Sequence, residues 1–188
     1  MLRENEITEL PATIGNLDKV YNLWLYRNQL TSLPPEIGDM DSLAKLSAFE
    51  NQLTSLPPEL GNATNLYWLD VHDNWLPQLP SSIGNLTNLT TLYLQNNGLV
   101  ALPNTITNLT MLESFDTAEN NIVCDQLAAE PFASWQFVGD VTCVDSIPTA
   151  VAISNQTTQQ TTSSLISISL LLLIGMTYGG VNLVNIKR

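Results

Sequence analysis

The chain has 188 residues, a net charge of -12 and only 13% charged side chains. Its length allows one domain with an appendage, and its acidity argues against nucleic acid as a partner, because nucleic-acid binding depends on clustered lysine and arginine. All 18 acidic residues lie between Glu4 and Asp145, and no residue from Ser146 to Ile186 is charged. Composition therefore indicates an acidic body followed by an uncharged tail.

An asparagine recurs every 23 residues through the first two thirds of the chain, at Asn5, Asn28, Asn51, Asn74, Asn97 and Asn120. Apolar residues stand eight, five and three positions before most of these asparagines, and a Leu-Pro pair and a further apolar residue follow the first five. A single coil of this kind cannot bury its own leucines. The period therefore predicts a solenoid in which each repeat covers the next.

The pattern LxxLxLxxN resembles the repeat of the leucine-rich repeat family, and the resemblance covers residues 1–123. It implies an α/β solenoid, a right-handed horseshoe segment of about five repeats. Each repeat is expected to give one short parallel strand to a concave face and an irregular or 3₁₀ segment to the convex face. Because Met1 stands in mid-repeat, we expect the N-terminal cap of such solenoids to be absent from this chain. Residues 2–6 include charged side chains and no apolar core follows them, so we expect no signal peptide in this sequence, and the alternative is that the chain is a fragment of a longer protein.

The recurring asparagine has a structural interpretation. A buried polar group must be paired, so each amide is expected to bond to backbone groups of neighbouring coils. The residues of this asparagine ladder are Asn28, Asn51, Asn74, Asn97 and Asn120.

Ligands of leucine-rich repeat solenoids usually contact the exposed strand positions of the concave face. In this sequence those positions carry aromatic side chains, which are not needed to fill the core, and acidic side chains lie next to them. Such a combination is typical of protein-binding hot spots, and the acids favour a basic partner. The alternative is that the aromatic rings pack only on each other across neighbouring strands. The predicted ligand-binding residues are Trp24, Tyr26, Phe49, Trp68, Asp70, His72, Asp73 and Tyr93.

The sequence gives no indication of enzyme chemistry. His72 is the only histidine, and its repeat phase places it on an open surface without a pocket that excludes water. No phosphate-binding loop is present, and His72 with two aspartates makes too few ligands for a closed metal site. We therefore expect no catalytic residues, no metal and no cofactor.

The segment 124–144 contains both cysteines of the chain, Cys124 and Cys143, together with Trp135. It is similar to the C-terminal caps of extracellular leucine-rich repeat proteins, in which cysteines and a tryptophan cover the last coil. The resemblance implies a disulfide between Cys124 and Cys143, worth about 3 kcal/mol for a loop of this size. The alternative is two buried free thiols in a cytosolic protein.

The tail is predicted to cross a membrane. Residues 165–186 contain no charge, and about 20 helical residues span the roughly 30 Å of a bilayer core. The basic residues Lys187 and Arg188 follow, so the positive-inside tendency places residues 187–188 in the cytosol and the repeats outside the cell. Residues 145–164, rich in serine, threonine and glutamine, are expected to form a stalk. A lipid-anchor signal is the alternative.

Two observations bear on the side of the membrane that the repeats occupy. Five sequons permit glycosylation outside the cell, at Asn62, Asn85, Asn88, Asn108 and Asn155. The return sequence LPxxIGNL, in contrast, is similar to that of the intracellular Ras-group leucine-rich repeats. We expect a single-pass cell-membrane protein with the repeats outside, and the alternative is a tail-anchored cytosolic scaffold.

These features together predict a membrane-tethered, receptor-like recognition module without its own signalling domain. Its expected partners are a protein or peptide ligand, preferably basic, the membrane itself, and a co-receptor for signal transduction. No nucleic acid is expected among them.

Overall fold

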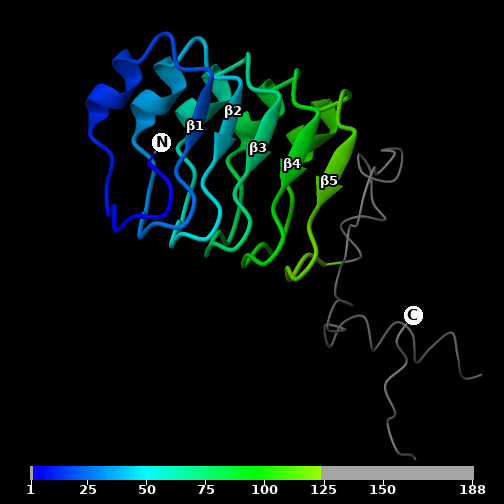
Figure 1. Ribbon diagram of the computed structural model, residues 1–188. Helices are drawn as coiled ribbons and strands as arrows, with labels where there is room; N and C mark the ends of the chain where they lie inside the picture. Colours follow the sequence, from blue (N-terminus) through cyan, green and yellow to red (C-terminus); the bar gives the residue numbers. More distant parts are fainter. Residues whose placement is uncertain (1, 124–188) are drawn as a thin grey trace, which may run out of the picture. The chain divides into compact units, whose positions relative to one another are not determined.

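The computed structural model describes residues 2–123, which form a solenoid of stacked coils (Figure 1). Each coil contributes one three-residue strand, and the five strands form one sheet in the order β1-β2-β3-β4-β5. All neighbouring strands pair in parallel, with each residue opposite the one 23 positions later. The strands are β1 (Asn22–Trp24), β2 (Lys45–Ser47), β3 (Trp68–Asp70), β4 (Thr91–Tyr93) and β5 (Ser114–Asp116).

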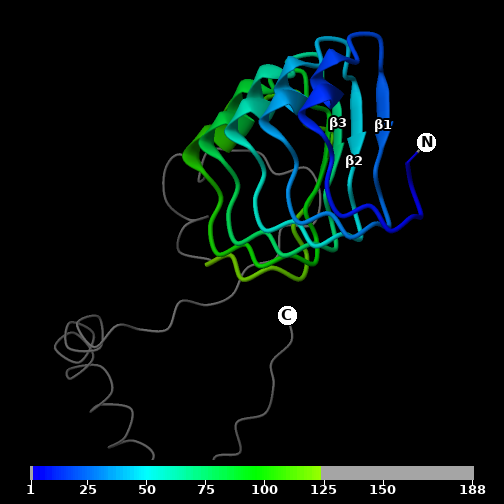
Figure 2. The same cartoon turned by 90° about the vertical axis from the view of Figure 1, so that its left-hand side faces the viewer.

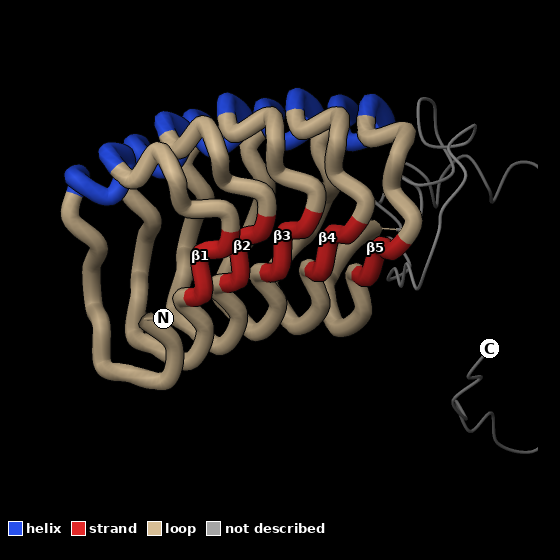
Figure 3. Tube along the Cα trace, turned by 45° about the horizontal axis from the view of Figure 1, so that its top comes forward, coloured by secondary structure: helices blue, strands red, loops and turns tan. Residues whose placement is uncertain are grey.

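The return of each coil contains a short 3₁₀ helix, and within residues 2–123 these are the only helices. Figures 2 and 3 show the 3₁₀ helices as one row and the strands as another, on different sides of the coils. The predicted parallel solenoid is therefore confirmed. The helices are η1 (Ala12–Asn16), η2 (Pro35–Asp39), η3 (Pro58–Asn62), η4 (Ser81–Asn85) and η5 (Asn104–Asn108).

In residues 2–123, no helix has the length and apolar character needed to cross a membrane. The predicted transmembrane helix (165–186) lies outside the described residues. The same is true of the predicted cap (124–144) with Cys124 and Cys143, the stalk (145–164), the sequon at Asn155 and the basic end (187–188).

The core consists of aligned leucines. The central residue of every strand points inward and is buried, so Leu46, Leu69 and Leu92 stack in register, and Phe115 takes the same position in β5. Because the strand period is two, the residues on either side of each central leucine face the opposite way. This alternation fixes which side chains reach the outer surface of the sheet.

Each ladder asparagine joins its own coil to the preceding one. The Oδ1 atom of Asn51 accepts a hydrogen bond from the backbone N–H of Leu30 at 3.0 Å, while its Nδ2 atom donates to the carbonyls of Leu25 and Ala48 at 3.1 and 3.0 Å. Asn74 repeats these contacts one coil later. The amide thus satisfies backbone groups that the short strands leave unpaired.

The residue before each of these asparagines has a left-handed backbone, with φ between 50° and 56°. This conformation costs a residue with a Cβ atom about 1–2 kcal/mol. It turns the chain sharply after the strand, and the following asparagine can then point inward. The residues concerned are Glu4, Arg27, Glu50, Asp73, Asn96 and Glu119.

The 3₁₀ helices of adjacent coils approach so closely that only glycine fits between them. A Cβ atom on Gly61 would lie 2.5 Å from the carbonyl oxygen of Ser82, and one on Gly38 would lie 2.1 Å from that of Glu59. In η5 the same position is Thr107, whose hydroxyl donates to the carbonyl of Asn104 at 2.9 Å.

Replacing Gly61 by alanine should destabilise the solenoid, because backbone atoms of two coils must separate to admit the methyl group. We expect the free energy of unfolding to fall by about 1–3 kcal/mol in urea denaturation followed by circular dichroism. Gly98→Ala is the matched control, since its Cβ would meet no atom closer than 3.6 Å. Equal stability of the two variants would contradict the close approach of the 3₁₀ helices.

Candidate binding surface on the sheet

The outward side chains of β1–β5, with the residues that follow each strand, form a surface that we call the sheet face. Because the strands pair in register, equivalent residues of successive coils lie side by side in four rows. This is the surface predicted to be concave and to bind ligands. The rows are Asn22, Lys45, Trp68, Thr91 and Ser114; Trp24, Ser47, Asp70, Tyr93 and Asp116; Tyr26, Phe49, His72, Gln95 and Ala118; and Arg27, Glu50, Asp73, Asn96 and Glu119.

Three rings of the third row form a continuous stack. The ring centroids of Tyr26 and Phe49 are 4.5 Å apart with an interplanar angle of 6°, and those of Phe49 and His72 are 4.4 Å apart at 11°. At the N-terminal end, the guanidinium group of Arg3 lies 5.6 Å from the Tyr26 centroid and donates to its hydroxyl. The stack thus spans three coils.

A second group of rings lies across the first and second rows. The indoles of Trp24 and Trp68 meet edge to face, with centroids 5.6 Å apart, and Trp68 meets Tyr93 in the same way at 6.3 Å. The hydroxyls of Tyr93 and Ser114 are 3.2 Å apart. The rings do pack on each other, as the alternative interpretation expects. All five predicted aromatic residues nevertheless remain partly exposed, so their packing leaves surface for a ligand.

His72 lies between two carboxylates. Its Nδ1 atom is 2.5 Å from Oδ1 of Asp70, and its Nε2 atom is 3.4 Å from Oδ2 of Asp73. Burial alone would lower the pKa of His72, but the hydrogen bond to Asp70 and the charges of Asp70, Asp73 and Glu50 outweigh it. The pKa of His72 is therefore raised above its ordinary value of 6.5.

The basic side chains near the sheet face are engaged in other contacts. Arg27 lies 3.1 Å from a carboxylate oxygen of Glu50 and 3.9 Å from one of Glu4. The ammonium group of Lys45 lies 5.2 Å from the centroid of Tyr67. Neither Arg27 nor Lys45 forms a salt bridge with Asp70 or Asp73, whose ionisable neighbour in the described part of the chain is His72.

Two members of the rows are more buried than the sequence suggests. Ser47 and Asp70 occupy exposed strand positions in the repeat, yet they are only 1% and 5% exposed. Ser47 lies beside Trp24 on one neighbouring strand and Asp70 on the other, and its Oγ atom has no hydrogen-bond partner. The sequence does contain a signal for the burial of Ser47. Two residues with large rings, Trp24 and Trp68, stand on the strands that flank this small serine.

The sequons differ in the structure. Asn62, Asn85 and Asn108 are the last residues of η3, η4 and η5, and their side chains are exposed. The Nδ2 atom of Asn88 instead donates to the carbonyl of Thr64 at 2.8 Å. Asn88 is exposed as well, but its Nδ2 atom, to which a glycan would be attached, is engaged in this bond.

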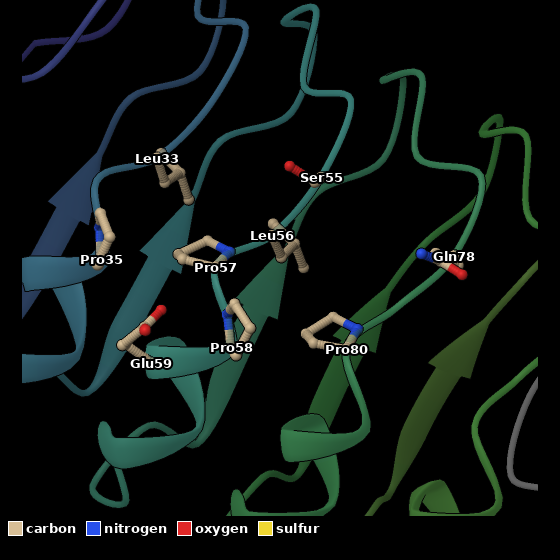
Figure 4. A pocket seen from close by; sticks show the side chains of 9 residues that line it. All are labelled: Leu33, Pro35, Ser55, Leu56, Pro57, Pro58, Glu59, Gln78 and Pro80. Atoms are coloured by element: carbon tan, nitrogen blue, oxygen red, sulfur yellow. The ribbon is translucent and has the colours of Figure 1, made fainter.

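A groove of about 470 Å³ lies away from the sheet face, along the segments that lead into η2, η3 and η4 (Figure 4). Pro57, Pro58 and Pro80 line it, and Glu59 is the one charged residue among its lining residues. It lacks the combination of acid, base and nucleophile that catalysis requires. Within residues 2–123, no three residues with His, Cys, Asp or Glu side chains are grouped to hold a metal ion.

Residues 49–130 match the family model of a leucine-rich repeat region, whereas no curated protein matches the chain. Among solved structures, a leucine-rich repeat protein of Leptospira interrogans has 35% sequence identity and a TM-score of 0.63 over 67% of this chain and 33% of that one. A TDR receptor has 32% identity and a TM-score of 0.58, over 62% of this chain and 21% of its own. A plant ice-binding protein, with 24% identity and a TM-score of 0.58 over 65% of this chain and 42% of its own, shares the fold alone. The chain thus spans less than half the length of each.

The raised pKa of His72 predicts how stability depends on pH. A group whose pKa is higher in the folded state stabilises that state fully below its ordinary pKa, and this contribution is lost as the pH rises through the folded value. The free energy of unfolding should therefore decrease from about pH 6 upward through the folded pKa. His72→Gln should lack this component, because His72 is the only histidine. Urea denaturation of both proteins at a series of pH values checks this, and an identical pH dependence would contradict it.

Proposed function

This chain belongs to the leucine-rich repeat family, and we propose that it is a membrane-tethered recognition module that binds a protein or peptide on its sheet face. The observation that carries this proposal is the alignment of partly exposed aromatic rings beside acids on the sheet face. A protein-interaction role is consistent with the similarity to a TDR receptor.

The aromatic residues suit such a role because they are already held in place. A ring that stacks on its neighbours loses little further rotational freedom when a partner covers it, and large rigid rings dominate the affinity of protein interfaces. Trp24, Trp68 and Tyr93 form one such group, and Tyr26 and Phe49 belong to the other. The stack of Tyr26, Phe49 and His72 is therefore organised before the partner arrives.

The charges favour a basic partner. Glu50, Asp70 and Asp73 lie beside the rings, while Arg27 is paired with Glu4 and Glu50. Complementary charges accelerate association and exclude partners of the wrong sign. A basic segment of a protein or peptide is the ligand that fits both the rings and the acids.

The proposal includes no catalytic role. Both ring nitrogens of His72 face carboxylates, Asp70 and Asp73, so neither is beside a nucleophile that it could activate. The leucine-rich repeat family also acts in general by binding rather than by catalysis.

Residues 165–186, an uncharged segment long enough for a bilayer, support the proposed membrane tether. The exposed sequons at Asn62, Asn85 and Asn108 support a location of the repeats outside the cell. Transmission of a signal would then depend on a co-receptor. The second candidate, a tail-anchored cytosolic scaffold, is favoured by one observation, the LPxxIGNL return sequence.

Selection of a random peptide library on the chain tests the binding surface. We expect enriched peptides to contain lysine or arginine, and the double variant Trp24→Ala with Trp68→Ala to weaken their binding at least about tenfold, the effect of losing hot-spot residues. The matched control is Tyr21→Ala with Trp75→Ala, which removes two rings that are 64% and 62% exposed and lie outside the four rows. Peptides that bind both double variants equally would contradict the proposed surface, provided that circular dichroism shows both to be folded.

Protease treatment of sealed membrane vesicles tests the topology. If the repeats lie outside the cell, they are lumenal in vesicles of the secretory pathway, survive added protease, and change mass after deglycosidase treatment. Asn62→Gln, Asn85→Gln and Asn108→Gln should then together remove most of the glycan on the repeats. Digestion of the repeats without any glycan would support the cytosolic scaffold instead.

A further inference from the structure

The side chain of Ser47 is an unusual feature of the sheet face. It alternates with the core residue Leu46, so it points to the outer surface of the sheet, but it is only 1% exposed. Its Oγ atom is enclosed and makes no hydrogen bond. An enclosed hydroxyl without a partner is destabilising, and a ligand with a polar hydrogen would relieve that cost.

We attribute the burial of Ser47 to Trp24 and Trp68. They lie on β1 and β3, on either side of β2, and two strand spacings amount to about 9.6 Å. Their ring centroids are nevertheless only 5.6 Å apart. The two indoles must therefore lean toward each other above β2, and Ser47 is directly beside Trp24 in the strand register.

Asp70 is the neighbour of Ser47 on the other side, and its side chain is 6% exposed. One carboxylate oxygen, Oδ1, contacts the Nδ1 atom and the backbone N–H of His72. The other oxygen, Oδ2, makes no hydrogen bond within residues 2–123, the part of the chain that the structure describes. Asp70 and Ser47 are thus neighbours in the strand register, both on the outer surface of the sheet.

We propose that the sheet face takes up one cationic side chain of its partner, a lysine or an arginine, between Trp24 and Trp68, where the cation bonds to Ser47 and pairs with Asp70. The inference rests on the proposed function and names the chemistry of its ligand. On binding, the two indoles separate and their faces come to enclose the charged group.

Each group of this cation site fits that ligand. An ammonium or guanidinium group has several N–H donors, enough to reach both the Ser47 hydroxyl and the free oxygen of Asp70. Indole faces attract cations, and more strongly when water is excluded. A neutral side chain would gain no attraction from the charges of Asp70, Asp73 and Glu50, and an acidic one would be repelled by them.

The first experiment uses small probes with the full chain. Nα-acetyl-lysine amide and Nα-acetyl-arginine amide are titrated at constant ionic strength into the ¹⁵N-labelled protein. Nα-acetyl-norleucine amide and Nα-acetyl-citrulline amide serve as their neutral counterparts. We expect saturable shifts of the indole N–H signals of Trp24 and Trp68 with the cationic probes alone, while the signal of the exposed Trp75 stays in place. Equal shifts with the neutral probes, or no shift of Trp24 and Trp68, would overturn the proposal.

Two variants distinguish binding at the cation site from nonspecific electrostatic attraction of the probes. Asp70→Asn should weaken binding of the cationic probes about tenfold or more, as expected for the loss of a hydrogen bond to a charged partner. Asp116→Asn is the matched control, because it removes the same charge from the same row, and its Oδ1 atom also accepts a bond from the backbone N–H two residues on. Equal weakening by both variants would overturn the proposal.

Ser47→Ala provides a test that does not depend on the charge of Asp70. The variant should bind the cationic probes more weakly, yet unfold at the same or a higher urea concentration, because it removes an enclosed hydroxyl without a partner. Unchanged probe binding by Ser47→Ala would overturn the role of the hydroxyl.

The selected peptides distinguish the failure of this proposal from the failure of the proposed function. Peptides that require Trp24 and Trp68 but bind Asp70→Asn as tightly as the unchanged chain would overturn the cation site and leave protein recognition by the sheet face intact. Peptides that require neither tryptophan would contradict both.

Discussion

The hydrogen bonds of the recurring asparagine hold each coil at a fixed position on the one before it. A three-residue strand offers few backbone hydrogen bonds, so register cannot depend on the strands alone. The amide of Asn51 adds contacts to Leu30, Leu25 and Ala48, and leaving such groups unpaired would cost about 1–3 kcal/mol each. Because the same contacts recur in the neighbouring coils, side chains 23 residues apart lie opposite each other.

The chemistry of the sheet face follows from this alignment. A tyrosine, a phenylalanine and a histidine that are 23 residues apart in sequence become the continuous stack of Tyr26, Phe49 and His72. The same alignment brings Trp24 and Trp68 together above β2 and places Asp70 beside Ser47. A shift of one residue in any coil would turn these side chains into the core. Stability and binding therefore share one structural cause.

The period of the sequence predicted the solenoid well, since spacing alone determines which leucines face inward and which residues share a row. Environments that arise between coils were harder to predict. The repeat marks Ser47 as an exposed position, and its burial depends on the size of Trp24 and Trp68 on the neighbouring strands. Likewise, the sequence does not distinguish the sequon at Asn88 from that at Asn85, whereas the bond from Asn88 to Thr64 does.

On this proposal, a basic segment of the partner lies on the sheet face and inserts a cation between Trp24 and Trp68. Photo-cross-linking tests it most directly, with a selected peptide in which a diazirine analogue replaces the basic residue. We expect mass spectrometry to locate the cross-links on β1, β2 and β3, around Trp24, Ser47 and Trp68. Cross-links concentrated on the 3₁₀ helices η1–η5, on the other side of the coils, would contradict it.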